Sequence, residues 1–322
     1  MNYYLGIDGG GTKTAYLLID EKGNEITKLE TLGSSYKDYG VDAVIDIIYE
    51  SIEMCMDLAK HKINSLRGIV IGLPCYGESR LEDALIKQKL NTVLGDIPFY
   101  LTNDVEVGFI GSLGLQPGVN VVAGTGSIAF GKNKENECAR SGGWSTFFGD
   151  EGSCYWLGRR TMELFSKQAD YRLDRSELYA LVMEQFKLKD PIDFIDLMEK
   201  EYVPKRSKVA SLQKILLKAA KAGDQSAIEL YQCATDELFM LIHSVAKQLD
   251  FIGRDFKVSF SGGLFHAKEF IVPNLECMTR LIGGHLTLPI FTPVQGAALL
   301  AVSLYANTSL DLVYQNLTNK VE

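Results

Sequence analysis

The stretch Asp8-Gly9-Gly10-Gly11-Thr12-Lys13-Thr14 decides the fold, because it links two runs of β-forming residues. Those runs, Tyr3–Ile7 and Thr14–Asp20, are rich in the aromatic and aliphatic side chains that are typical of strands. A polar turn at 21–24 follows, and Glu25–Glu30 then alternates as an exposed strand does. The glycine turn is therefore predicted to join one strand to the next rather than to lead into a helix.

This turn matches neither of the common phosphate-binding loops. A P-loop ends in Gly-Lys-Ser/Thr, whereas this turn has Gly11-Thr12-Lys13. The dinucleotide fingerprint needs a glycine where Thr14 stands, followed by a helix. Successive N–H groups of a glycine hairpin can still form a nest for phosphate oxygens. Thr12 would add a hydroxyl to such a nest and Lys13 a charge, the alternative being a tight hairpin without a ligand.

The pattern of the first strands restarts after Gln116. Val119–Ala123 has strand composition, Gly124-Thr125-Gly126-Ser127 is a second glycine turn, and Ile128–Lys132 is again strand-like. We interpret this layout as a duplicated unit, with one copy in each of two domains. A chain of 322 residues agrees with that count, since domains average about 150 residues.

Hydrophobic periodicity predicts the remaining elements. Helices are expected over Val41–Lys60, Ser79–Leu94, Val209–Ala222, Ser226–Leu249 and Val294–Asn307, and strands over Gly68–Leu73, Pro98–Thr102 and Lys257–Phe260. The chain is expected to be mostly helical between about Gly152 and Asp250. Gly283 and Gly284 are interpreted as ordinary loop glycines.

Composition excludes several classes of protein. The net charge of −8 argues against a nucleic-acid binder, and no apolar run approaches the ~20 residues that span a bilayer. The N-terminus lacks the features of a secretory signal, and the six cysteines form no CxxC pair, so a cytoplasmic protein with reduced thiols is expected. The four scattered histidines argue against a transition-metal site. The basic stretch Lys205-Arg206-Ser207-Lys208 is interpreted as a solvated helix entry.

Two aspartates follow predicted strands at positions where chemistry is expected. Asp8, beside the glycine nest, would repel bare phosphate, so we expect Mg²⁺ to lie between them, with Asp8 holding it through water. Asp104 ends one strand and opens a short helix. It could act as the general base for a phosphoryl acceptor, or it could simply cap that helix.

The segment from Arg140 to Ser153 combines glycines, acids and an aromatic residue. Trp144 could cover the apolar face of a sugar while Asp150 accepts its hydroxyl donors. The alternative is a buried Trp144, with Glu151 as an acid in the first turn of a helix. Further along, Ser261-Gly262-Gly263 could pass close to a base or ribose, or could be a glycine bend packed in the core.

Taken together, these motifs resemble the N-acetylglucosamine kinase group of the BadF/BadG/BcrA/BcrD-type ATPases, in the actin–hexokinase–Hsp70 superfamily. The motifs that carry the resemblance are Asp8–Thr14, Thr102-Asn103-Asp104, Gly124–Ser127, Ser141-Gly142-Gly143-Trp144 and Gly149-Asp150-Glu151-Gly152-Ser153. The match is weaker at Ser261–Leu264 and at Gln295-Gly296-Ala297.

The resemblance implies an α/β fold of two ribonuclease-H-like (actin-like ATPase) domains, with ATP and sugar in the cleft between them. The first domain would comprise 1–116 plus a C-terminal helix at about 307–322, and the second would comprise 117–306 with a helical insertion. The implied reaction is Mg²⁺-dependent phosphorylation, by ATP, of the 6-hydroxyl of N-acetylglucosamine or a relative such as N-acetylmuramic acid. Asp104 would be its base.

The resemblance also implies which residues bind ATP and which bind the sugar. The ATP-binding set is Asp8, Gly9, Gly10, Gly11, Thr12, Lys13, Thr14, Gly124, Thr125, Gly126, Ser127, Ala210, Gly262 and Gly263. The sugar-binding set is Ser35, Thr125, Gly143, Trp144, Ser145 and Asp150. Small molecules are thus the expected partners, without nucleic acid or membrane, and homodimerisation stays open.

Three departures from the family pattern concern the acceptor. Ser35 stands where the family usually has asparagine, Ser145 stands where it has glycine, and Gly72–Gly77 replaces a run of small residues. The identity of the sugar therefore stays open. Another alternative is an energy-coupling activator of a 2-hydroxyacyl-CoA dehydratase or benzoyl-CoA reductase. Its iron–sulfur cluster needs a cysteine at a glycine turn, and none flanks Gly124–Ser127. A nucleotide-switch scaffold would need an additional domain.

Overall fold

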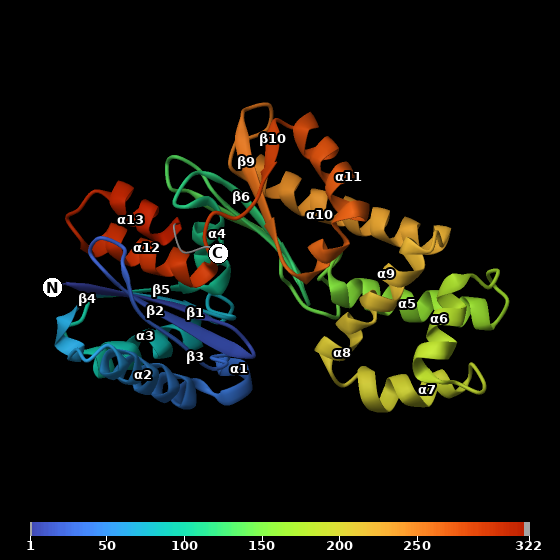
Figure 1. Cartoon of the computed structure of the whole chain (residues 1–322), viewed down its shortest axis with the longest axis horizontal. Coiled ribbons are helices and arrows are strands. Elements are labelled where there is room, and N and C mark those ends of the chain that lie inside the picture. The colour runs from blue at the N-terminus through green and yellow to red at the C-terminus, as the bar shows by residue number, and fades with distance from the viewer. Residues whose placement is uncertain (1, 319–322) are drawn as a thin grey trace. The chain divides into compact units, whose positions relative to one another are not determined.

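The computed structural model describes residues 2–318, and these divide into two compact units (Figure 1). Unit 1 contains residues 2–116 and 289–318, and unit 2 contains Pro117–Leu288. Each unit is built on one five-stranded sheet that mixes parallel and antiparallel pairs. The predicted α/β class, with one such sheet in each of two units, is confirmed.

The sheet of unit 1 has the strand order β3-β2-β1-β4-β5. Its strands are β1 (Tyr3–Gly9), β2 (Lys13–Asp20), β3 (Glu25–Leu32), β4 (Leu66–Leu73) and β5 (Phe99–Asn103). The first three form an antiparallel meander, whereas β4 and β5 run parallel to β1. The carboxyl ends of β1, β4 and β5 therefore meet at one edge of the sheet.

Helices cover both faces of this sheet (Figure 1). On one side lie α2 (Val41–Leu58) and α3 (Arg80–Leu94), whose buried apolar residues join those of the strands in one core. On the other side α12 (Pro293–Tyr305) packs against β1, β4 and α4 (Asp104–Leu113). The short helices of this unit are α1 (Tyr36–Tyr39), the 3₁₀ turn Ile63–Ser65 and α13 (Leu310–Thr318).

The chain returns to unit 1 at residue 289, earlier than the expected boundary near residue 307. The physical reason is the close approach between α12 and the first strand. A Cβ atom on Gly6 would overlap the backbone nitrogen of Ala298, and one on Gly296 would overlap that of Gly111. These glycines let α12 lie directly on the sheet and on α4, so the whole of α12 belongs to unit 1.

The sheet of unit 2 has the strand order β10-β9-β6-β7-β8. Its strands are β6 (Gly118–Ala123), β7 (Ser127–Lys132), β8 (Cys138–Gly142), β9 (Phe256–Ser261) and β10 (Gly284–Thr287). An antiparallel meander followed by two parallel strands repeats the layout of unit 1, as a duplicated unit requires. Gly284 was wrongly expected in a loop; it begins β10.

Seven α-helices of unit 2 follow from residue 154 onward. They are α5 (Cys154–Ala169), α6 (Glu177–Phe186), α7 (Asp193–Leu197), α8 (Arg206–Ser211), α9 (Gln213–Lys221), α10 (Gln225–Gln248) and α11 (Lys268–Leu281), with a π-helical turn at Met198–Tyr202 and a 3₁₀ turn at Gly263–Ala267. Helix α10 packs on β6, β7 and β8, while α5 to α9 form a helical segment between β8 and α10 in the chain.

The contact between α12 and the sheet gives a stability prediction. Gly6→Ala is expected to destabilise the protein by about 1–3 kcal/mol, because the new methyl group can be accommodated only if β1 and α12 separate. The free energy of unfolding, from urea titration followed by circular dichroism, measures the effect.

Gly108→Ala in α4 is the matched control. A Cβ atom there meets nothing within 4 Å, and alanine favours a helix interior over glycine by up to about 1 kcal/mol. The control should therefore leave stability unchanged or raise it. Equal stability of the two variants would contradict the packing argument.

Candidate functional site

The first glycine turn is closed by its own backbone and supported from behind. The N–H of Gly10 donates to the carbonyl of Lys13 at 2.9 Å, and the N–H of Ser34 donates to the carbonyl of Gly10 at 3.0 Å. A Cβ atom on Gly9 would overlap the hydroxyl of Ser34. Gly11 and Thr12 are exposed. The turn is thus fixed on one side and open to a ligand on the other.

Asp8 and Asp104 come together at the carboxyl edge of the sheet of unit 1. Asp8 pairs with Gly72 of β4, and Gly72 pairs with Thr102 of β5, two residues before Asp104. A Cβ atom on Gly72 would lie only 3.4 Å from the Cα of Asp104. The sheet register therefore places the two aspartates on either side of Gly72.

Both carboxyl groups titrate well above their usual range. Burial and, to a smaller extent, the charge of Asp104 raise the pKa of Asp8 to about 7, and the charge of Lys13 opposes this shift. Burial likewise raises the pKa of Asp104 to about 6, against the effect of backbone N–H groups at Val105 and Asp104 itself. Burial makes it unfavourable for both carboxyl groups to be ionised at once, and a bound cation would offset that cost.

Asp104 is not the cap of its helix. The side chain of Asn103 accepts a hydrogen bond from the N–H of Val105 at 2.9 Å, and it donates to the carbonyl of Tyr76 at 2.7 Å. Asn103 is therefore the N-cap of α4, and Asp104 is the first residue of the helix. The capping alternative for Asp104 was wrong, and its carboxyl group is not needed to cap the N-terminus of α4.

The other predicted residues of unit 1 differ in their exposure. Lys13 is exposed and pairs with Glu30 at 2.6 Å, an interaction worth little in water. Thr14 and Ser35 are buried, so their side chains face away from solvent. The hydroxyl of Ser34 is also buried and has no hydrogen-bond partner.

The second glycine turn is seated on the N-terminus of α5. The N–H of Cys154 donates to the carbonyl of Gly124 at 2.9 Å, and that of Tyr155 donates to Thr125 at 3.3 Å. Two donors of the first helical turn, which lack partners within the helix, are satisfied in this way. Within the turn the N–H of Gly124 donates to the carbonyl of Gly126 at 2.9 Å. The helix thus fixes the conformation of the turn.

Gly262, one of the two glycines predicted to lie near the nucleoside, contacts the same turn. Gly262 has a φ of +110°, and a Cβ atom there would overlap the carbonyl of Ala123. Gly262 and Gly263 are both exposed, which contradicts the alternative of a bend packed in the core. Ala210 is buried in α8, which packs against α5.

Asp150 lies over the second turn with a partner that sequence reasoning missed. One carboxylate oxygen of Asp150 accepts the N–H of Ser127 at 3.2 Å, and the other lies 2.5 Å from Nη2 of Arg206. The basic stretch does lead into α8 and is largely exposed, as expected for a solvated helix entry, but Arg206 also forms this ion pair. Arg206 begins α8 and reaches a residue 56 positions away in the chain, which no local pattern could indicate.

The segment between Gly143 and Gly149 exposes three aromatic rings. Trp144, Phe147 and Phe148 are 72%, 88% and 66% exposed. The buried alternative for Trp144 was therefore wrong. Its counterpart, Glu151 as an acid in the first turn, was also wrong, since Ser153 is the N-cap of α5 and Glu151 precedes it. The neighbouring Phe147 and Phe148 were not singled out from the sequence.

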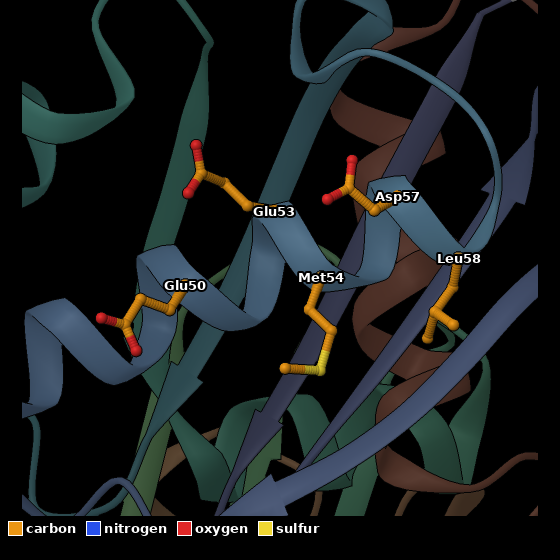
Figure 2. Close-up of a pocket in the computed structure, with 5 residues that line it drawn as sticks. All are labelled: Glu50, Glu53, Met54, Asp57 and Leu58. Atoms are coloured by element: carbon orange, nitrogen blue, oxygen red, sulfur yellow. The ribbon is translucent and has the colours of Figure 1, made fainter.

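A separate hollow lies along α2. Figure 2 shows the five residues that line it, Glu50, Glu53, Met54, Asp57 and Leu58, all carried by that helix. It contains none of the predicted site residues. Across residues 2–318 no group of three or more His, Cys, Asp or Glu side chains is arranged to hold a metal. No helix in that range has both the length and the apolarity to cross a bilayer.

Comparison with known proteins agrees with this architecture. The chain is 29% identical over 311 residues to an N-acetyl-D-glucosamine kinase of Dictyostelium discoideum, covering 93% of this chain and 98% of the relative. It is 29% identical over 272 residues to an N-acetylmuramic acid/N-acetylglucosamine kinase of Clostridium acetobutylicum, covering 84% and 88%.

Solved structures show the same fold. A Chromobacterium violaceum protein assigned as an N-acetylglucosamine kinase superposes with a TM-score of 0.75 at 25% identity, covering 94% of this chain and 99% of that one. A glucokinase of Streptomyces griseus shares the fold with a TM-score of 0.52 at 16% identity, covering 95% and 100%. The model of the BadF/BadG/BcrA/BcrD ATPase family matches residues 5–301, and the chain belongs to that family.

Proposed function

We propose that this chain is an ATP-dependent kinase that phosphorylates the 6-hydroxyl of an amino sugar, N-acetylglucosamine or a relative such as N-acetylmuramic acid. The observation that carries the proposal is the Asp8–Asp104 pair beside an exposed glycine turn. The activities for which the relatives are named support the class of acceptor.

Asp104 is the base in this proposal. With a pKa of about 6 its carboxylate is ionised at neutral pH, yet it is a stronger proton acceptor than an ordinary aspartate. It takes the proton of the sugar hydroxyl while the hydroxyl oxygen forms a bond to the γ-phosphorus. The bond between that phosphorus and the leaving oxygen breaks, and ADP departs.

The glycine turns provide the phosphate contacts in this proposal. In unit 1 the exposed N–H of Gly11, the hydroxyl of Thr12 and the charge of Lys13 would contact phosphate, supported by Gly9 and Gly10, and in unit 2 the turn Gly124–Ser127 offers a second phosphate contact. Asp8, with a pKa raised to about 7, fits a water-mediated cation site. When bound, Mg²⁺ neutralises phosphate charge. Gly262 and Gly263 would approach the nucleoside through exposed backbone, and Ala210 would support it from α8.

The acceptor groups are supplied mainly by unit 2. Trp144 presents an exposed ring that suits the apolar face of a pyranose. The carboxylate of Asp150 would accept hydroxyl donors in addition to the N–H of Ser127 and the guanidinium of Arg206. Thr125, Gly143 and Ser145 complete this set. Ser35 would lie behind this set, since the residue is buried and its carbonyl already accepts the N–H groups of Asp38 and Tyr39.

The alternative of an iron–sulfur activator receives no support from the described cysteines around the second turn. Cys154, whose N–H binds that turn, is buried, and burial raises the pKa of its thiol to about 11. A cluster ligand needs the opposite, a thiolate that forms readily. The kinase remains the function that the site favours.

The direct experiment incubates purified protein with Mg-ATP and a panel of neutral, anionic and cationic hexoses. ADP release is coupled to an optical assay, and the product is assigned by ³¹P and ¹³C NMR. The proposal expects turnover with N-acetylated amino sugars and phosphate on the 6-oxygen. No sugar-dependent turnover, together with a brown, iron-containing preparation, would favour the activator.

Asp104→Asn is expected to lower kcat by about 10²–10⁴-fold while ATP affinity stays within about threefold, because the amide cannot accept the proton. Glu106→Gln is the matched control on the same helix, since Glu106 bonds to Thr102 and not to substrate in this proposal. Its kcat should change less than about threefold. Wild-type turnover by Asp104→Asn would exclude Asp104 as the base.

The raised pKa of Asp104 predicts an acid limb in the pH profile. The base works only when ionised, so kcat/KM for the sugar should fall about tenfold per pH unit below a pKa of about 6. The profile is measured from pH 4.5 to 8 with saturating Mg-ATP. A flat profile down to pH 5 would show that no group with this pKa controls the reaction.

A further inference from the structure

The ion pair between Arg206 and Asp150 is built as a fixed part of unit 2. The side chain of Asp150 is 4% exposed and that of Arg206 is 50% exposed. A Cβ atom on Gly126 would come within 2.5 Å of both Arg206 Nη2 and Asp150 Oδ1. Glycine at this position is what lets the pair lie directly over the second turn.

Asp150 is itself constrained by its backbone. Its φ is +59°, in the left-handed region that disfavours most side chains. Its two oxygens are used separately, one by the N–H of Ser127 and one by Arg206. The carboxylate thus has one cation and one backbone donor, and the pair as a whole carries no net charge.

We propose that Arg206 is a specificity-determining residue, which makes the acceptor site favour a neutral, N-acylated amino sugar over the protonated free amine. The inference rests on the proposed function, in which Asp150 receives hydroxyl donors of the sugar. A buried carboxylate without Arg206 would attract an ammonium group. The guanidinium, charged at every physiological pH, cancels that attraction and repels the ammonium.

The test compares kcat/KM for N-acetylglucosamine with that for glucosamine below pH 7, where the free amine is protonated. Arg206→Met should lower this ratio at least tenfold, equivalent to about 1.4 kcal/mol. Arg206→Lys keeps the cation and should hold the ratio within about threefold of wild type. A merely structural role would weaken both sugars equally and leave the ratio unchanged.

Lys208→Met is the matched control on the same helix. Lys208 pairs at 2.8 Å with Glu201, an exposed residue, so its removal should alter neither sugar. Arg206→Met leaves the buried carboxylate of Asp150 without its cation. The double variant Asp150→Asn/Arg206→Met removes that carboxylate as well. The double variant is neutral again and should bind acceptors more weakly overall, with a ratio near that of wild type.

Dissociation constants from calorimetry without ATP give the same ratio independently of turnover. Wild-type protein that binds both sugars but transfers no phosphate would contradict the proposed function, while the binding ratio still tests Arg206. Two results would overturn the Arg206 proposal: an unchanged ratio in a folded Arg206→Met variant, or no binding of either sugar by the wild type.

Discussion

The candidate site depends on the burial of two carboxyl groups, those of Asp8 and Asp104, at one edge of the sheet of unit 1. Asp8 and Asp104 have pKa values of about 7 and 6, above the ordinary aspartate value of 3.8. Since folding raises both values, their contribution to stability is greatest below about pH 4 and is lost as pH rises through 6 and 7. At neutral pH the pair destabilises the fold, a cost that a bound cation would offset and that functional sites commonly carry.

Around both turns, glycines lie so close to neighbouring residues that there is no room for a side chain. Gly9 lies against Ser34, Gly262 lies against Ala123, and Gly126 lies beneath the Arg206–Asp150 pair. In each case a Cβ atom would lie within 2.5 Å of a neighbouring atom. The glycines therefore serve two purposes, exposing N–H groups and letting supporting elements approach the turn.

Local sequence patterns were sufficient to predict most strands and both glycine turns. Tyr3–Ile7 and Val119–Ala123 carry their own strand composition, and the turns carry their own glycines. What the patterns could not show depends on distant partners. Arg206 is defined by Asp150, 56 residues away, and α12 is an apolar helix whose sequence does not say which sheet it covers. The short strand β10 begins with glycine and is recognisable only through its pairing with β9.

The most direct measurement is a ¹³C NMR titration of the aspartate side-chain carboxyl carbons, assigned with Asp8→Asn and Asp104→Asn, with and without Mg²⁺ and a non-hydrolysable ATP analogue. Without them, two carboxyl groups should titrate near pH 6 and pH 7. With them, the pKa of Asp8 should fall by about one unit or more, because a cation favours the ionised form. Titration of both groups near pH 4, unchanged by Mg²⁺ and the analogue, would contradict the account.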